Sequence, residues 1–432
     1  MDERQYNSPF STRYGSKEMR HTFSDYHRHM TWRKLWLVLA EAQKHCGIPI
    51  TDQQIEEMKA VTDIDYNKVA EYEKETLHDV MAHIMEFSDR CPTAKNIIHL
   101  GATSCYVTDN ADMILMHEAM QILRDKLKHI VLVLAAMADD RRDVPIVGRT
   151  HLQRAQLTTV GKRICMWVND LDIAYDMLCN AIDNTRLLGY KGATGSQASA
   201  KTLFDGDYNS AQYVDGYVST VFEIKRSSIT GQTYTRLYDS IIANALSILA
   251  QATTKMATDI RLMACFGEMY EGFSKGQVGS SAMPYKRNPI TCEKVCGLSR
   301  HIICNAQNMA TTAATQWLER TLDDSSNRRL SIPELFMAAD EVLISIGKII
   351  DRLTINIEEC AKNVADHAKM ASLEDDIIMS VLSGGNRQEE HQNAIYSEGS
   401  TSAHINTGFA SEQVKNYCWH IRKKYGAPQI LW

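Results

Sequence analysis

The stretch ADMILMHEAMQILRDKLKHIVLVLAAMAD, residues 111–139, decides the fold class of this 432-residue chain. Its apolar residues recur in steps of three and four, which is the period of one face of an α-helix. They form one stripe that consists of Leu115, Ala119, Leu123, Leu127, Ile130, Leu134 and Met137. A stripe of this length predicts one long helix that buries this face against other helices.

Four further stretches repeat the pattern, namely 153–186, 235–265, 291–318 and 332–358, the last of them following Pro333. The stripe in 235–265 consists of Ile242, Ala245, Leu249, Ala252, Met256, Ile260 and Met263. These stretches are much longer than the usual helix of about 11–12 residues. Long helices of this kind predict an all-α fold built on a helical bundle with near-parallel packing.

Shorter helical patterns flank the bundle on both sides. Residues 24–46 predict one helix, with Trp32, Leu35, Trp36, Leu39 and Ala42 on its apolar face, and residues 50–88 predict two or three more. After about residue 356 the pattern becomes short and irregular. We therefore expect an N-terminal helical domain over 1–110, the long-helix bundle over 111–356, and a short C-terminal helical domain over 357–432.

Composition excludes several classes of protein. With a net charge of −6, the protein has no overall positive electrostatic field that would attract nucleic acid. The eleven cysteines have no disulfide-framework spacing, which is typical of reduced cytosolic thiols. The sequence contains no run of eighteen apolar residues, so no membrane span is predicted. The first thirty residues contain no apolar signal segment. We expect a cytoplasmic protein that binds neither nucleic acid nor membrane.

Polar clusters recur at the ends of the predicted long helices. They are 99–104 (HLGATS), 148–156 (GRTHLQRAQ), 230–236 (TGQTYTR) and 319–329 (ERTLDDSSNRR). Hydroxyls, amides and cations are the donors that hold carboxylate and phosphate groups, and helix N-termini add free N–H groups. Together the clusters predict a polyanionic small-molecule substrate.

Each cluster also has a structural interpretation. Thr103 and Ser104 could simply cap a helix, His151 could be a structural histidine, and 319–329 could be a solvated face. His78 and His83 lie five residues apart, but they lack a third ligand at useful spacing, so no metal site is expected. The functional interpretation depends on the clusters taken jointly.

Residues 279–289, GSSAMPYKRNP, break the helical pattern between two long helices. This segment resembles the signature loop of the fumarase/aspartase superfamily, and its MPYKRNP form resembles the family of animal-type adenylosuccinate lyases. Further matching stretches are STRY at 11–14, HDVMAH at 78–83, IHLGATSCY at 98–106, TH at 150–151, TGQTY at 230–234 and WLERTLDDSSNRR at 317–329. The resemblance runs in order over about residues 8–392.

The resemblance implies a lyase of purine biosynthesis that works without a metal or organic cofactor. Its reaction is a β-elimination that releases fumarate from adenylosuccinate, leaving AMP, and from succinylated aminoimidazole carboxamide ribotide (SAICAR), leaving AICAR. The family's fold has three domains, and its central bundle assembles into a homotetramer. The small molecules adenylosuccinate and SAICAR are therefore the implied substrates.

The resemblance also implies roles for individual residues. Ser280 is the base, with its alkoxide stabilised by Lys286 and loop N–H groups, and His151 is the general acid. His78 contacts the substrate or orients His151, while Asn288 and Glu293 support the loop and His151. The implied substrate-binding residues are Arg13, Tyr14, His78, Asp79, Thr103, Ser104, Gln232, Asn288, Lys294, Arg320, Ser325 and Arg329.

The chain departs from the family pattern in three places. Leu77 and Lys294 stand where close relatives carry arginine, and a lysine lacks the bidentate fork of an arginine. The C-terminal domain is also short, because only about twenty residues separate two family-like segments, GNRQ at 385–388 and 407–414. A catalytically impaired helical scaffold or shortened form is therefore one alternative, and a sister enzyme such as argininosuccinate lyase or fumarase is another.

Helix length predicts that no single chain holds a complete site. At a rise of about 1.5 Å per residue, the 111–139 helix separates Thr103 and Ser104 from His151 by about 40 Å. The 235–265 helix separates Gln232 from Ser280 by about 45 Å on the same rise. A nucleotide spans far less, so we expect composite sites in which several chains contribute residues.

Overall fold

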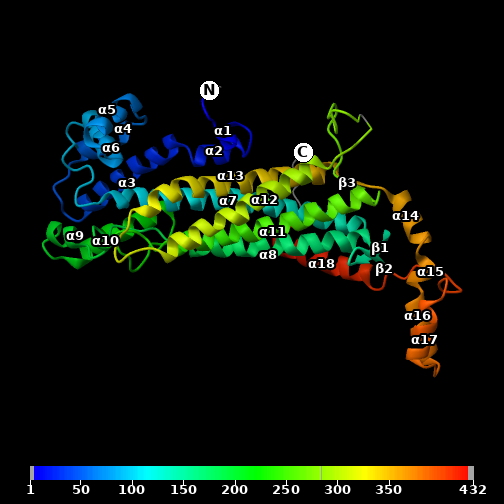
Figure 1. Cartoon of the computed structure of the whole chain (residues 1–432). Coiled ribbons are helices and arrows are strands. Elements are labelled where there is room, and N and C mark those ends of the chain that lie inside the picture. The colour runs from blue at the N-terminus through cyan, green and yellow to red at the C-terminus, as the bar shows by residue number, and fades with distance from the viewer. Residues whose placement is uncertain (1–3, 284, 427–432) are drawn as a thin grey trace. The chain divides into compact units, whose positions relative to one another are not determined.

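The computed structural model describes residues 4–283 and 285–426 of the chain (Figure 1). The chain forms two compact units, each built from three segments. Unit 1 comprises Met1–Leu123, Met177–Ser247 and His301–Asp340, and unit 2 comprises Arg124–Asp176, Ile248–Arg300 and Glu341–Trp432. The three-domain division in chain order stays a prediction.

Five long helices contribute residues to both units. They are α7 (Ser104–Asp140), α8 (Val160–Asn184), α11 (Leu237–Cys265), α12 (Ile290–Ala314) and α13 (Asp323–Arg352). The apolar stripe of α11 is fully buried, and so is that of α7 apart from the half-buried Met137. The predicted all-α class and the long helices are therefore confirmed.

Two details of the predicted helices are wrong. Residues 153–159 form a strand, β2 (Gln153–Thr159), which pairs antiparallel with β1 (Pro145–Thr150), so the expected 153–186 helix begins only at Val160. Pro333 does not precede α13 but lies inside it. A proline has no N–H, so the carbonyl of Arg329, four residues earlier, lacks its usual partner in the helix.

Unit 1 contains the N-terminal helices. They are α1 (Pro9–Thr12), α2 (Lys17–Thr22), α3 (Asp25–His45), α4 (Asp52–Ala60), α5 (Tyr66–Thr76) and α6 (Asp79–Arg90), with α9 (Ala198–Leu203) and α10 (Tyr208–Phe222) from the second segment. The side chain of Ser24 accepts a hydrogen bond from His27 N and so begins α3. Helix α3 packs against α4 and α10, and α5 packs against α6. The five apolar residues predicted for the face of α3 are all buried.

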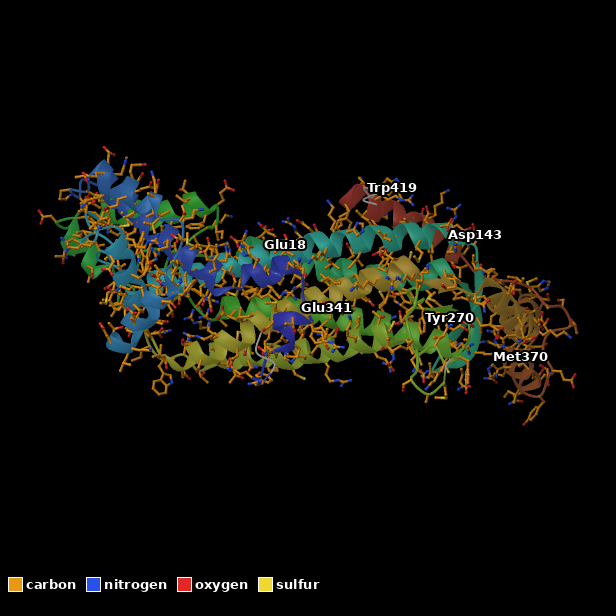
Figure 2. All side chains as sticks on the ribbon, turned by 90° about the horizontal axis from the view of Figure 1, so that it is seen from above. Glu18, Asp143, Tyr270, Glu341, Met370 and Trp419 are labelled. Atoms are coloured by element: carbon orange, nitrogen blue, oxygen red, sulfur yellow. The ribbon has the colours of Figure 1, made fainter. Side chains whose placement is uncertain are left out.

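Unit 2 contains the hairpin and the C-terminal elements. They are β1, β2, β3 (Met269–Tyr270), β4 (Thr354–Ile355), α14 (Ile357–Ala365), α15 (Ala368–Ala371), α16 (Leu373–Leu382), α17 (Arg387–Ile395) and α18 (Ala410–Tyr425). Helix α14 packs on β1, and Val147, Leu157 and Val364 form a small core there. Helix α18 buries one face, while Trp419 points away from the ribbon on the other (Figure 2).

No helix within residues 4–283 and 285–426 combines the length and the apolar composition that a bilayer crossing requires.

Two histidines in unit 1 whose rings lie against each other predict acid sensitivity. The rings of His29 and His83 lie 4.0 Å apart, and Nδ1 of His83 is buried without a hydrogen-bond partner among the described residues. Burial, reinforced by nearby positive charge, lowers the pKa of His83 to about 3 and that of His29 to about 4. The folded protein therefore stays neutral at these positions while the unfolded chain, with pKa near 6.5, takes up protons.

We expect the free energy of unfolding to fall as the pH drops from 6.5 towards 4, by about 1.4 kcal/mol per pH unit for each histidine. Thermal unfolding of the wild type and of His83→Gln at pH 7, 6 and 5 measures this loss. The variant should lose less stability on acidification than the wild type. His45→Gln, at an exposed position on α3, is the control and should behave as the wild type. Equal pH slopes for all three proteins would contradict the assignment.

Candidate functional site

The signature loop lies in unit 2 between β3 and α12. The Ser280 hydroxyl accepts hydrogen bonds from the backbone N–H groups of Met283 at 3.1 Å and Ala282 at 3.4 Å. These N–H groups would also stabilise negative charge on the same oxygen. The loop therefore supplies part of the environment that a serine base requires.

Two contacts close the signature loop on itself. Asn288 Nδ2 donates to the carbonyl of Gly279 at 3.0 Å. A Cβ on Gly279 would meet the carbonyl of Lys286 and the ring of Phe273, so only glycine fits there. The Lys286 side chain is exposed, and within the described part of the loop no hydrogen bond joins it to Ser280. Pro284, part of the predicted loop motif, lies outside the described residues.

The first turn of α12 carries two predicted site residues. Glu293 is exposed, and the Nζ atom of Lys294 donates to Glu341 Oε1 at 2.7 Å. The buried Glu271, which sequence reasoning missed, accepts from the N–H groups of Thr291 and Cys292 and thereby caps the helix. Glu271 lies 20 residues before Thr291 in the sequence. The sequence pattern therefore gives no indication that Glu271 contacts α12.

His151 occupies the tight turn between β1 and β2. Its φ is 53° and that of Leu152 is 62°, so two residues with side chains adopt the left-handed conformation there. Just before the turn, Arg149 lies over the ring of Phe266 at 3.9 Å and pairs with the buried Glu268 at 3.5 Å. The strand is thus anchored while the His151 side chain is exposed. Backbone strain at such a position is typical of functional sites.

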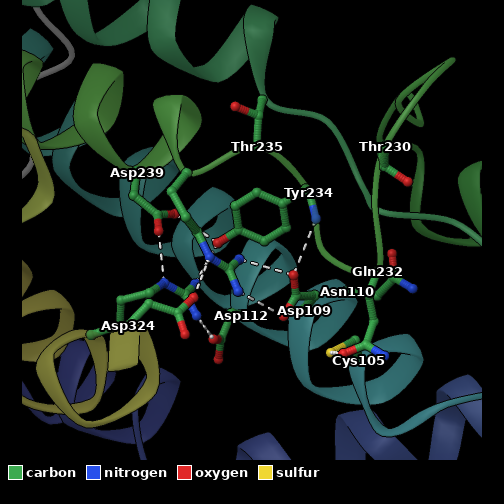
Figure 3. A network of polar contacts seen from close by, with 12 residues as sticks. Cys105, Asp109, Asn110, Asp112, Thr230, Gln232, Tyr234, Thr235, Asp239 and Asp324 are labelled. Carbon is green, nitrogen blue, oxygen red and sulfur yellow. Dashed lines mark hydrogen bonds and ion pairs between the residues drawn. The ribbon is translucent and has the colours of Figure 1, made fainter. Parts of the chain in front are cut away.

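Contacts within unit 1 join three of the four polar clusters. Gln232 Oε1 accepts from the thiol of Cys105 at 3.7 Å, next to Thr103 and Ser104 (Figure 3). The backbone N–H of Gln232 donates to the carbonyl of Glu319 at 3.0 Å, immediately before Arg320. Segments 99–104, 230–236 and 319–329 therefore lie together, although more than 80 residues separate any two of them in sequence.

An ion pair joins the start of α6 to the 319–329 segment. Asp79 pairs with Arg329 at 3.7 Å, and His78 begins α6, where its Nδ1 accepts from Met81 N at 3.3 Å. Leu77, just before His78, is 88% exposed in the left-handed conformation. A leucine at this exposed position supplies no charge to a ligand, and the expected loss of one anion contact stays a prediction.

The remaining predicted binding residues of unit 1 have fewer contacts. Arg13 ends α1 and is exposed, and the Tyr14 ring packs against Phe10 at 5.9 Å. Ser325 is half-buried in the first turn of α13. Unit 1 thus collects cations, hydroxyls and an amide suited to an anionic ligand, whereas the predicted base, acid and loop lysine belong to unit 2.

Within the described residues, no three His, Cys, Asp or Glu side chains are grouped in a way that would hold a metal ion. His83, considered above with His78, packs its ring against that of His29.

Known proteins resemble this chain over most of its length. The model of a lyase family matches residues 17–304. An adenylosuccinate lyase from Saccharomyces cerevisiae is 43% identical over 392 residues, which cover 90% of this chain and 81% of that protein. One from Schistosoma mansoni is 43% identical over 397 residues, covering 91% and 83%. An archaeal one, from Archaeoglobus fulgidus, is 30% identical over 387 residues, covering 89% and 85%.

Solved structures share the fold over nearly the whole chain. The 3-carboxy-cis,cis-muconate lactonizing enzyme from Pseudomonas putida matches with a TM-score of 0.83 at 18% identity, covering 97% of this chain and 100% of that one. A fumarate lyase from Mesorhizobium sp. BNC1 matches with a TM-score of 0.81 at 19% identity, covering 96% and 99%. At these identities the likeness concerns the fold alone.

Proposed function

The chain belongs to the adenylosuccinate lyase family, and we propose that it releases fumarate by β-elimination from adenylosuccinate, giving AMP, and from SAICAR, giving AICAR. The observation that carries this proposal is the 43% identity over 90% of the chain to the yeast lyase. The signature loop with its intact Ser280 and Lys286 lies inside the matched family region. The proposed enzyme is therefore a carbon–nitrogen lyase of purine biosynthesis.

The proposed mechanism needs one base, one acid and pre-placed donors. Ser280 removes the proton from the carbon next to a carboxylate, and His151 protonates the departing nitrogen. The carbanion is stabilised as a dianionic carboxylate by donors aimed at its oxygens. The two N–H groups that bond Ser280 and the cation of Lys286 support the charged form of the base.

The unit 1 group is proposed to bind the substrate anions. Arg320 and Arg329 supply charge, and Gln232 supplies an amide. Around them Arg13, Tyr14, Asp79, Thr103, Ser104 and Ser325 complete the binding set, with Lys294 and Asn288 from unit 2. His78, Glu293 and Asn288 assist by orienting His151 and the loop.

We propose a homotetramer with composite sites. Helix α7 has 37 residues, α11 has 29 and α12 has 25. At about 1.5 Å per residue these lengths are about 55, 44 and 38 Å, well beyond the span of a nucleotide. Closed association of antiparallel bundles would let different chains supply the unit 1 and unit 2 groups of each site. A cytoplasmic location is supported by the eleven cysteines, none of which forms a disulfide in the described part of the chain.

One assay tests the proposed function. Absorbance is followed with adenylosuccinate, with argininosuccinate and with malate as substrates. Turnover of adenylosuccinate alone is expected, whereas turnover of another substrate would favour a sister enzyme. No turnover of any of the three would favour the shortened, impaired form, since the chain covers 81% of the length of the yeast lyase.

Lys294→Arg is expected to change the two substrate activities unequally. Lys294 is held by Glu341, which also accepts from the hydroxyl of Ser345 at 3.3 Å. The guanidinium group of an arginine can stay bonded to Glu341 and still offer further N–H donors to the substrate. The ratio of kcat/KM for adenylosuccinate and SAICAR should shift by up to about tenfold. Lys348→Arg, at an exposed position, is the control; equal changes for both substrates would count against the assignment.

A further inference from the structure

A balanced ionic network adjoins the proposed substrate-binding group of unit 1, and Figure 3 draws part of it. Four carboxylates and four guanidinium groups take part, namely Asp109, Asp112, Asp239 and Asp324 with Arg28, Arg236, Arg320 and Arg328. They come from α3, α7, the 230–236 segment, α11 and the 319–329 segment that leads into α13. The proposed reaction assigns a role to Arg320 alone.

Arg236 is the residue in which the contacts of the network converge. Its side chain is 1% exposed, and its Nε donates to Asp324 Oδ2 at 2.6 Å. Nη1 and Nη2 donate to the two oxygens of Asp109 at 2.9 and 3.3 Å, and the guanidinium lies 4.6 Å from the centre of the Tyr234 ring. Burial alone would lower the pKa of Arg236, but the surrounding carboxylates, led by Asp109, raise it above its ordinary value.

Both carboxylates bound by Arg236 also hold elements that carry proposed substrate groups. Asp324 accepts from Nη1 of Arg320 at 3.2 and 3.3 Å. Asp109 accepts from the backbone N–H of Tyr234 at 3.2 Å, two residues after Gln232. One planar guanidinium therefore connects the Arg320 side chain with the backbone beside Gln232.

We propose that Arg236 and Asp324 are positioning residues that set the geometry of Arg320 and Gln232 for binding the substrate anion. Neither of the two needs to touch the substrate. A buried ion pair is a poor source of net stability, because desolvation offsets most of the attraction. A planar fork, in contrast, fixes both direction and spacing, and small misplacements of binding groups reduce activity strongly. This inference rests on the proposed function, since that function makes Arg320 and Gln232 substrate groups.

Arg328 is a matched control within the same network. Its side chain is 6% exposed, it bonds Asp239 at 2.7 Å and Asp112 at 3.1 Å, and it donates to the Tyr234 hydroxyl. These partners are all structural residues. A merely structural network would respond in the same way to Arg236→Lys and to Arg328→Lys.

The experiment measures KM and kcat for adenylosuccinate together with the midpoint of thermal unfolding. Arg236→Lys should raise KM about tenfold while kcat stays within about threefold, because lysine cannot make the two-sided bond. Arg328→Lys should lower the unfolding midpoint but leave KM unchanged. Asp324→Asn keeps the side-chain shape and should raise KM as well, which supplies a second variant if Arg236→Lys does not fold.

A double substitution tests whether Arg236 acts through Arg320. Arg236→Lys in an Arg320→Lys background should raise KM by less than it does in the wild type, since coupled residues are non-additive. Additive effects, or equal KM changes in the Arg236 and Arg328 variants, would overturn the inference. The experiment distinguishes failure of this inference from failure of the proposed function. An inactive wild type contradicts the function, whereas an active wild type with unchanged KM in Arg236→Lys and Asp324→Asn contradicts only this inference.

Discussion

Ser280→Ala is expected to lower kcat for adenylosuccinate by at least 100-fold, because a positioned base contributes about 10²–10⁴-fold. Binding should change little, since the alanine removes one hydroxyl and no charge. In the structure this hydroxyl already accepts two backbone N–H groups of its own loop, from Ala282 and Met283. The same groups would hold the alkoxide, so the loss should be confined to the proton-transfer step.

Single-turnover kinetics and calorimetric titration with adenylosuccinate separate the two effects for Ser280→Ala. The neighbouring Ser281 is exposed and makes a matched control, and Ser281→Ala should keep kcat within about threefold of the wild type. A Ser280→Ala protein that retained more than about a tenth of the wild-type kcat would sink the assignment, because no base contributes so little.

Mixing two inactive variants is expected to restore activity if the sites are composite. Ser280 belongs to unit 2, and His78 belongs to unit 1, where its neighbour Asp79 pairs with Arg329. In a tetramer, sites that take the loop from a His78→Ala chain and His78 from a Ser280→Ala chain are intact. Random exchange of equal amounts should yield about a quarter of the wild-type activity.

The control for this mixture is Ser280→Ala with Lys286→Ala. Both residues lie on one loop, closed by the Asn288 to Gly279 hydrogen bond, so no mixed site can draw them from different chains. That mixture should stay inactive. Arg320→Ala can replace His78→Ala as the unit 1 partner if the histidine variant keeps activity. Verified subunit exchange without recovery, or an active monomer in light scattering, would refute the composite-site proposal.

Local sequence determined the helices and the identity of the chemistry. The stripe from Leu115 to Leu134 predicts α7, because burial of one apolar face needs no information from elsewhere in the chain. The signature loop could be recognised for a similar reason, since Ser280, Lys286 and Asn288 lie within nine residues of one another. The function could therefore be recognised from short continuous segments of the sequence.

Tertiary structure alone decided which distant residues meet. Residues 153–159, the second strand of the hairpin that carries His151, were wrongly predicted as the start of a helix. Strand pairing between β1 and β2 outweighs the local helical pattern there. The partners Asp324 and Asp109 lie 88 and 127 residues from Arg236, and Glu341 lies 47 residues from Lys294. Periodicity indicates which side chains are buried but not which charges neutralise each other. Pairing of buried charges is chosen by the packing of whole helices, because an unpaired ion in the interior is too costly to remain.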